Sequence, residues 1–141
     1  MDNLPGTDLP PGVRDLTRRS AMVVDDEPGI VFLCTKLLAR AGYAVRHAND
    51  GKAAMELILA DKPDILFLDL MMPIMDGFEV CERVKKNPET SDIIIAIISA
   101  LDGDQDRDYA MSLGANFYFA KPFVPKQFLN EILPQVEAAL G

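Results

Sequence analysis

Three carboxylates stand where apolar segments of this chain end. Asp69 closes the unbroken apolar run of residues 65–68, and Asp25 and Asp26 close the apolar run of residues 21–24. A charge at the end of a buried strand is costly unless a cation compensates it. If both runs are parallel strands, their carboxylates meet at one edge of the sheet and repel one another until a cation joins them. Oxygen ligands of this kind suit Mg²⁺.

A hydroxyl group and an ammonium group follow two further apolar runs. Ser99 comes after residues 93–98, and Lys121 comes after residues 115–120. A lysine ammonium is a compact positive charge, and a serine hydroxyl is a hydrogen-bond donor. With a metal ion they would neutralise the charge on a phosphoryl group transferred to Asp69, since an aspartate carboxylate can act as a nucleophile.

Alternating apolar segments predict an α/β domain around these side chains. Segments 65–68 and 93–98 are apolar throughout, as parallel strands that are covered on both faces should be. Right-handed crossovers through the intervening helices then give a doubly wound, five-stranded parallel sheet. Pro134 falls inside the last predicted helix, where it should bend or loosen the turn that holds Asn130. Strands are expected at residues 21–24, 43–48, 65–68, 93–98 and 115–120, and helices at residues 28–41, 50–61, 77–86, 104–113 and 125–140.

Residues 1–19 differ in composition from the rest of the chain. They contain three prolines and two glycines among few apolar residues, which predicts a flexible N-terminal arm. Residues 20–141 are expected to form one domain, because 141 residues is an ordinary length for a single domain. Both a stand-alone protein and a fragment of a longer one fit this sequence.

The composition is that of an acidic globular protein. The formal net charge is −8 and the sequence pI is near 4.5, which disfavours direct binding to nucleic acid or to anionic membranes. No apolar run is long enough to span a bilayer, and the first residues lack the features of a secretory signal. Cys34 and Cys81 are isolated in helical patterns, which predicts reduced, buried thiols. A cytoplasmic location is expected.

The ordered set of motifs resembles the receiver domain of two-component response regulators, of the single-domain chemotaxis type. The resemblance covers residues 20–140, and the order of the motifs makes it specific although no single motif is. It implies a flavodoxin-like (βα)5 fold with strand order 2-1-3-4-5. The motifs are Val24-Asp25-Asp26, the segment DLMMPIMDG from Asp69 to Gly77, Ser99-Ala100, Gly114-Ala115-Asn116 and Lys121-Pro122-Phe123.

The resemblance implies that Asp69 accepts a phosphoryl group from a phosphohistidine of a histidine kinase or a histidine phosphotransfer protein. Asp26 and Asp69 would coordinate Mg²⁺ directly, together with the backbone carbonyl of Met71. Asp25 would hold the ion through water. Lys121 would contact Asp69 first and the bound phosphoryl group afterwards.

The resemblance also implies how the signal leaves the site. Ser99 would turn toward the phosphoryl oxygen, and Tyr118 would rotate inward to fill the space that is left. The Lys121–Pro122 peptide bond is expected to be cis. The population shift would be read on the face made by the fourth helix, fifth strand and fifth helix, which could bind a downstream protein or a second copy of the chain.

Some of these features have simpler interpretations. The two carboxylates after the first strand could cap the next helix, and Tyr118 could serve packing alone. Residues 102–108 carry alternating aspartates, but a calcium loop would need Gly and Glu where the chain has Arg107 and Leu113. An acidic, solvated helix start is expected there instead. His47, the single histidine, is expected to be an ordinary residue at the end of a strand.

Other functions fit part of the pattern. A phosphatase with an aspartate nucleophile would need a second aspartate where the chain has Met71. A flavin or nucleotide binder would need glycines in the loop at residues 25–28, which is acidic. A receiver that only docks, without phosphorylation, would not need the combination of Asp26, Asp69, Ser99 and Lys121.

The chain is not expected to be an enzyme that turns over a separate substrate. The resemblance implies Mg²⁺-dependent self-phosphorylation from small phosphodonors and slow self-dephosphorylation only. Met71 and Leu101 are expected to flank the approach of water to the phosphorylated carboxylate. Neither side chain can orient a water molecule by hydrogen bonding, so hydrolysis should be slow.

Overall fold

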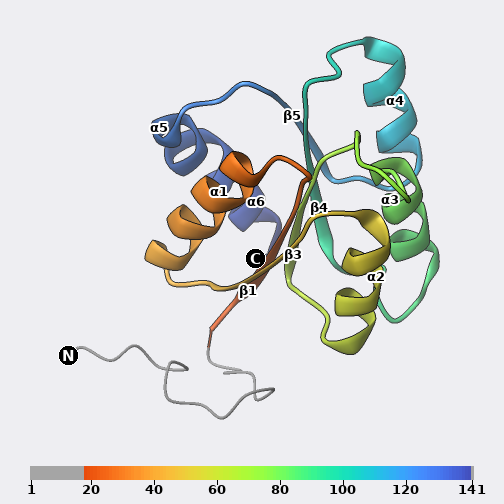
Figure 1. The fold of residues 1–141 in the computed structure, drawn as a ribbon, viewed down its shortest axis with the longest axis horizontal. Coiled ribbons are helices and arrows are strands. Elements are labelled where there is room, and N and C mark those ends of the chain that lie inside the picture. Colours follow the sequence, from red (N-terminus) through yellow and green to blue (C-terminus); the bar gives the residue numbers. More distant parts are fainter. Residues whose placement is uncertain (1–17, 141) are drawn as a thin grey trace.

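The computed structural model describes residues 18–140, which form one five-stranded parallel sheet between two layers of helices (Figure 1). The strand order is β2-β1-β3-β4-β5, so the predicted flavodoxin-like topology is confirmed. The strands are β1 (Ser20–Val24), β2 (Ala44–Ala48), β3 (Ile65–Leu68), β4 (Ile94–Ser99) and β5 (Phe117–Ala120).

Helices cover both faces of the sheet, as a doubly wound fold requires (Figure 1). One layer consists of α1 (Pro28–Arg40) with α5 (Pro125–Gln127), η1 (Phe128–Ile132) and α6 (Leu133–Leu140). The other layer consists of α2 (Gly51–Ala60), α3 (Gly77–Lys86) and α4 (Asp104–Ser112). None of these helices is long and apolar enough to cross a membrane.

Successive residues of β3 supply two separate hydrophobic cores. Leu66 and Leu68 pack in the core under α2, α3 and α4, whereas Ile65 and Phe67 pack in the core under α1 and α6. All four side chains are at most 2% exposed. Burial of each such side chain contributes about 1.5–3 kcal/mol to stability. The run is therefore apolar at every position, because neither face of the strand meets water.

The last helix differs from the single helix expected at residues 125–140. It is divided into α5, the π-helical turn η1 and α6. The N–H of Leu133 donates to the carbonyl of Phe128, five residues back. Pro134 explains this turn, because a proline donates no hydrogen bond and its ring would clash with the carbonyl of Asn130 in a regular helix. The expected loosening therefore takes the form of a wider turn.

Strand β5 is shorter than the expected segment 115–120, because the chain needs two residues to leave α4. Gly114 ends α4 in the left-handed conformation, with φ +108°. The N–H of Ala115 bonds back to the carbonyl of Ala110. Asn116 then contacts Ile95 of β4 twice: its backbone N–H donates to the carbonyl of Ile95 at 2.9 Å, and its side-chain Oδ1 accepts from the N–H of Ile95 at 2.8 Å. Regular pairing with β4 begins only at Phe117.

The predicted arm, residues 1–19, lies outside the described residues except for its last two positions. The guanidinium of Arg18 donates to the carbonyl of Gly42 at 3.2 Å and to the carbonyl of Tyr43 at 2.7 Å. The chain therefore reaches β1 beside the end of α1.

Gly77 lets α3 begin directly against the backbone of Asp69. A Cβ at this position would lie 2.1 Å from the carbonyl oxygen of Asp69 and 2.7 Å from the Cα of Leu70. The N–H of Gly77 donates to the carbonyl of Leu70 at 3.0 Å. The preceding Asp76 caps the helix, because its side chain accepts from the N–H of Glu79 at 2.9 Å. Only glycine permits this approach.

We expect Gly77→Ala to destabilise the domain by about 2–3 kcal/mol, because backbone atoms would have to move to admit the methyl group. Gly29→Ala is the matched control: it lies in α1 and a Cβ there would meet nothing within 4 Å. The control should be neutral or up to about 1 kcal/mol more stable, since alanine favours helix. Urea unfolding of both variants measures the difference. Equal stabilities would contradict the close packing of Gly77.

Candidate functional site

Strand pairing brings three carboxylates together at the carboxyl edge of the sheet. Asp25 and Asp26 follow β1, and Asp69 follows the neighbouring β3. The N–H of Asp69 donates to the carbonyl of Val24 at 2.9 Å, which fixes the two strand ends side by side. One carboxylate oxygen from each of the three residues lies within 4.8 Å of the others. The side chains that the sequence analysis grouped therefore form one cluster.

Two of the three carboxylates are buried. Asp25 is 3% exposed and Asp69 is 5% exposed, whereas Asp26 faces solvent. Burial raises the pKa of Asp69 to about 6; the charge of Asp25 adds to this rise, and Lys121 and the backbone N–H of Met71 oppose it. Burial also raises the pKa of Asp25, although hydrogen bonds from Lys121 and the Glu27 backbone oppose it. The ionised forms of Asp25 and Asp69 are therefore less favourable in the folded domain than they are in water.

Lys121 supplies the positive charge of the site. Its Nζ lies 2.8 Å from Asp25 Oδ2 and 3.7 Å from Asp69 Oδ2, and its side chain is 8% exposed. Burial would lower the pKa of Lys121, but its hydrogen bonds to Asp25 and Glu27 outweigh burial and raise it. The N–H of Lys121 donates to the carbonyl of Ser99 at 2.9 Å, and the Lys121–Pro122 peptide bond is cis.

Glu27 is part of the site although the sequence analysis gave it no role. Its Oε1 lies 2.6 Å from the Nζ of Lys121, which is the shortest contact of that ammonium group with a carboxylate among the described residues. Its backbone N–H donates to Asp25 Oδ1 at 2.9 Å. Glu27 is also the N-cap residue of α1. The acidity of residues 25–28 was the only signal in the sequence that could have suggested this contact.

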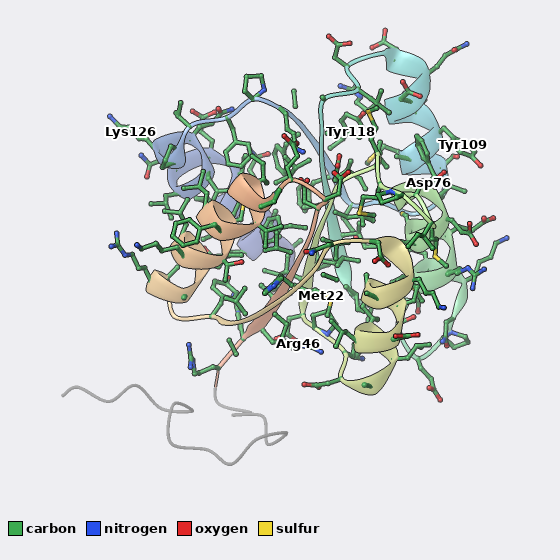
Figure 2. All side chains as sticks on the ribbon, viewed as in Figure 1. Met22, Arg46, Asp76, Tyr109, Tyr118 and Lys126 are labelled. Atoms are coloured by element: carbon green, nitrogen blue, oxygen red, sulfur yellow. The ribbon has the colours of Figure 1, made fainter. Side chains whose placement is uncertain are left out.

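Ser99 and Tyr118 hold the two peptide groups on either side of Leu101. Ser99, at the end of β4, is fully buried, and its Oγ accepts from the N–H of Leu101 at 3.1 Å. The hydroxyl of Tyr118 on β5, labelled in Figure 2, donates to the carbonyl of Leu101. Both groups therefore fix the start of the loop between β4 and α4.

The loop between β3 and α3 presents apolar side chains to solvent beside Asp69. Met71 is 55% exposed and Ile74 is 78% exposed. Ile74 also has φ +73°, which is rare for a β-branched residue and costs on the order of 1–3 kcal/mol. The N–H of Met75 donates to the carbonyl of Pro73 at 2.8 Å and helps to hold the loop in this shape.

The two other features considered in the sequence lie outside the carboxylate cluster. Asp104 and Asp106 occupy the first turn of α4, where negative charge favours the helix dipole, as expected of an acidic helix start. His47 is exposed on the edge strand β2. Asp25 and Asp26 do not cap α1, since its N-cap residue is Glu27.

The cluster fits a hard divalent cation. Its donor atoms are all oxygens and lie close together, and the negative charge of the three carboxylates exceeds the single positive charge of Lys121, which contacts Asp25 and Asp69. This excess of negative charge, with two members buried, is the electrostatic condition that a bound cation relieves. The exposed carboxylate of Asp26 leaves the cluster open to solvent on one side.

Asp69→Asn should stabilise the metal-free protein at neutral pH. The folded-state pKa of Asp69 is raised, so its ionisation opposes folding. The penalty is complete above pH 6 and disappears below 3.8, the ordinary pKa of an aspartate. In EDTA at pH 7.5 the variant should be more stable by on the order of 2 kcal/mol.

Urea unfolding at pH 7.5 and at pH 4 measures the effect, and the advantage of Asp69→Asn should shrink at pH 4. Asp108→Asn, which neutralises an exposed carboxylate on α4, is the control and should change stability little at either pH. An advantage of equal size at both pH values would contradict the raised pKa of Asp69.

Known proteins share both the sequence pattern and the fold. Residues 21–133 match the family model of the response regulator receiver domain. The chain is 38% identical over 119 residues to the DNA-binding dual master transcriptional regulator RpaA of Synechocystis, an alignment covering 84% of this chain and 48% of RpaA. The chain spans about half the length of the curated relatives that it matches.

Solved structures agree with this match. The chemotaxis response regulator CheY4 of Vibrio cholerae superposes with a TM-score of 0.79 at 27% identity, covering 84% of this chain and 98% of CheY4. The phosphorylated cyanobacterial phytochrome response regulator RcpA superposes with a TM-score of 0.78 at 25% identity, covering 88% of this chain and 95% of RcpA. The family match extends from β1 to the start of α6 and contains the whole carboxylate cluster. The chain therefore belongs to the response regulator receiver domains, which are phosphoacceptor modules of two-component signalling rather than enzymes.

Proposed function

We propose that Asp69 is the phosphoacceptor and that it takes its phosphoryl group from a phosphohistidine of a histidine kinase or a histidine phosphotransfer protein. Membership of the family implies a kinase partner. The observation that carries the assignment is the position of Asp69: it is buried at the end of β3, in the carboxylate cluster, with the ammonium group of Lys121 at 3.7 Å. A pKa of about 6 leaves Asp69 largely ionised at neutral pH, as a nucleophile must be.

The transfer is a substitution at phosphorus. An Oδ atom of Asp69 forms a bond to the phosphorus atom while the P–N bond to the donor imidazole breaks. The electron pair of that bond stays on the imidazole nitrogen, which takes a proton from solvent. Lys121 is placed to offset the negative charge that the phosphoryl oxygens bring beside Asp25 and Asp69, because its side chain is buried between them.

Mg²⁺ is the cation that we assign to the cluster. Asp26 and Asp69 would hold it directly with the backbone carbonyl of Met71, and Asp25 would hold it through water. The support for this assignment is the all-oxygen donor set, which is the type that Mg²⁺ prefers. When bound, the ion supplies positive charge that neutralises the transferring phosphoryl oxygens.

The signal would leave the site through Leu101. Ser99 Oγ accepts from the N–H of Leu101, and Tyr118 donates to its carbonyl. A serine hydroxyl that turns to donate to a phosphoryl oxygen gives up its bond to Leu101 and frees the start of the loop before α4. Tyr118 would then adjust to the new position of the Leu101 carbonyl, which shifts the face of α4, β5 and α5.

That face is the candidate surface for a downstream protein or for a second copy of the chain. We do not assign direct nucleic-acid binding to this domain, since its net charge of −8 opposes contact with phosphates. A cytoplasmic location agrees with the free, buried thiols of Cys34 and Cys81.

Incubation with acetyl phosphate and Mg²⁺ should add one phosphoryl group per chain, measured by intact mass spectrometry. The adduct should be acid-stable and base-labile, absent in Asp69→Asn, and present in the control Asp108→Asn. Beryllofluoride with Mg²⁺ should shift the NMR signals of Ser99, Leu101 and Tyr118. A domain that only docks would give neither the adduct nor the NMR shifts, and an adduct that persisted in Asp69→Asn would exclude Asp69 as acceptor.

The phosphorylated domain should lose its phosphoryl group slowly, because the exposed side chain of Met71 cannot orient a water molecule. Met71→Asn should hasten the loss about 2- to 10-fold, the value of one net hydrogen bond to that water. Decay of the adduct in EDTA-quenched and unquenched samples measures the rate. Met111→Asn, at an exposed methionine of α4, is the control. An unchanged or slower decay in Met71→Asn would count against this explanation.

A further inference from the structure

The ammonium group of Lys121 is shared by three carboxylates, and Asp69 is the most distant of them. Its Nζ lies 2.6 Å from Glu27 Oε1, 2.8 Å from Asp25 Oδ2 and 3.7 Å from Asp69 Oδ2. The first two distances are hydrogen bonds, whereas the third is an ion pair without one. The ammonium group of Lys121 therefore lies closer to Glu27 and Asp25 than to Asp69, the residue whose phosphoryl group it would contact.

The backbone cannot bring Lys121 closer to Asp69. Its N–H donates to the carbonyl of Ser99 at 2.9 Å, in direct continuation of the pairing between β4 and β5. Only a movement of the Lys121 side chain can therefore bring its ammonium group closer to Asp69. That movement requires the contact with Glu27 or the contact with Asp25 to break.

The contact with Glu27 is the one that can break at low cost. The side chain of Glu27 is 60% exposed, so its carboxylate exchanges Lys121 for water easily. The carboxylate of Asp25 has an exposure of 4% and no such alternative. The backbone of Glu27 stays in place in either case, because its N–H is bonded to Asp25 Oδ1.

We propose that Glu27 is a positioning residue for phosphorylation: it holds the ammonium group of Lys121 away from Asp69 in the unphosphorylated domain and releases it when a phosphoryl group arrives. This inference rests on the proposed role of Asp69. Glu27 does not touch the reacting atoms and acts only through Lys121. Its effect is to slow the reaction with small phosphodonors, because the Glu27–Lys121 contact has to open before Lys121 can meet the incoming charge.

Two substitutions at Glu27 distinguish the effect of its side-chain length from the effect of its charge. Glu27→Gln removes the charge, whereas Glu27→Asp keeps the charge but shortens the side chain by one methylene group. Aspartate is also a favoured N-cap residue, so at the N-cap of α1 it should turn toward the N–H of Ile30 rather than toward Lys121. Glu56→Gln, at an exposed position of α2, is the control for the change in net charge.

Both Glu27 variants should take the phosphoryl group from acetyl phosphate about 2- to 5-fold faster than the wild type, the range expected for an exposed ion pair. Glu56→Gln should match the wild type. A faster Glu27→Gln with a Glu27→Asp at the wild-type rate would overturn the proposal, since charge alone would then explain the rate. Wild-type rates in both Glu27 variants would overturn it as well.

A measurement without any phosphodonor tests the contact itself. In both Glu27 variants the NMR signals of the Lys121 side-chain Cε–Hε group should shift from their wild-type positions, and in Glu56→Gln they should not. If the wild type takes no phosphoryl group at all, the proposed function fails, and this comparison alone decides whether Glu27 holds Lys121. Unchanged Lys121 signals in Glu27→Gln would overturn the proposal in that case too.

Discussion

Two buried carboxylates share one ammonium group in this domain, and that imbalance of charge governs the rest of its carboxyl edge. Asp25 and Asp69 lose most of their contact with water, yet Lys121 can neutralise only one of them. Burial, together with the charge of Asp25, raises the pKa of Asp69, and the negative charge that remains makes the site receptive to a cation. A folded domain tolerates such a site only because the apolar strands beneath it contribute far more stability than the site removes.

The sheet turns this local imbalance into a site with defined geometry. Pairing of β1 with β3 fixes the two buried carboxylates as neighbours, and pairing of β4 with β5 places Ser99 beside Lys121. Side chains from β4 and β5 also hold Leu101, since Ser99 accepts from its N–H and Tyr118 donates to its carbonyl. A charge added at the end of β3 therefore meets groups that are already bonded to the loop before α4.

The sequence was sufficient to predict the strand order from the family resemblance and the gathering of Asp25, Asp26 and Asp69 from strand-end positions. These predictions succeed because parallel strands place their carboxyl ends at one edge whatever the details of packing. Contacts made by flexible side chains are harder to predict. Glu27 reaches Lys121 across 94 residues of sequence, and no periodic pattern marks such a contact. The π-helical turn η1 shows the same limit, since Pro134 predicts a disturbance but not the wider turn that accommodates it.

Ile74 has a consequence for the stability of the loop beside Asp69. Glycine or asparagine would adopt its left-handed backbone with less strain, and a side chain that is 78% exposed adds nothing to the core. Isoleucine at this position therefore costs the folded domain stability and returns none through core packing. The loop five residues after Asp69 is thus a place where the domain is less stable than its own backbone would allow with another residue.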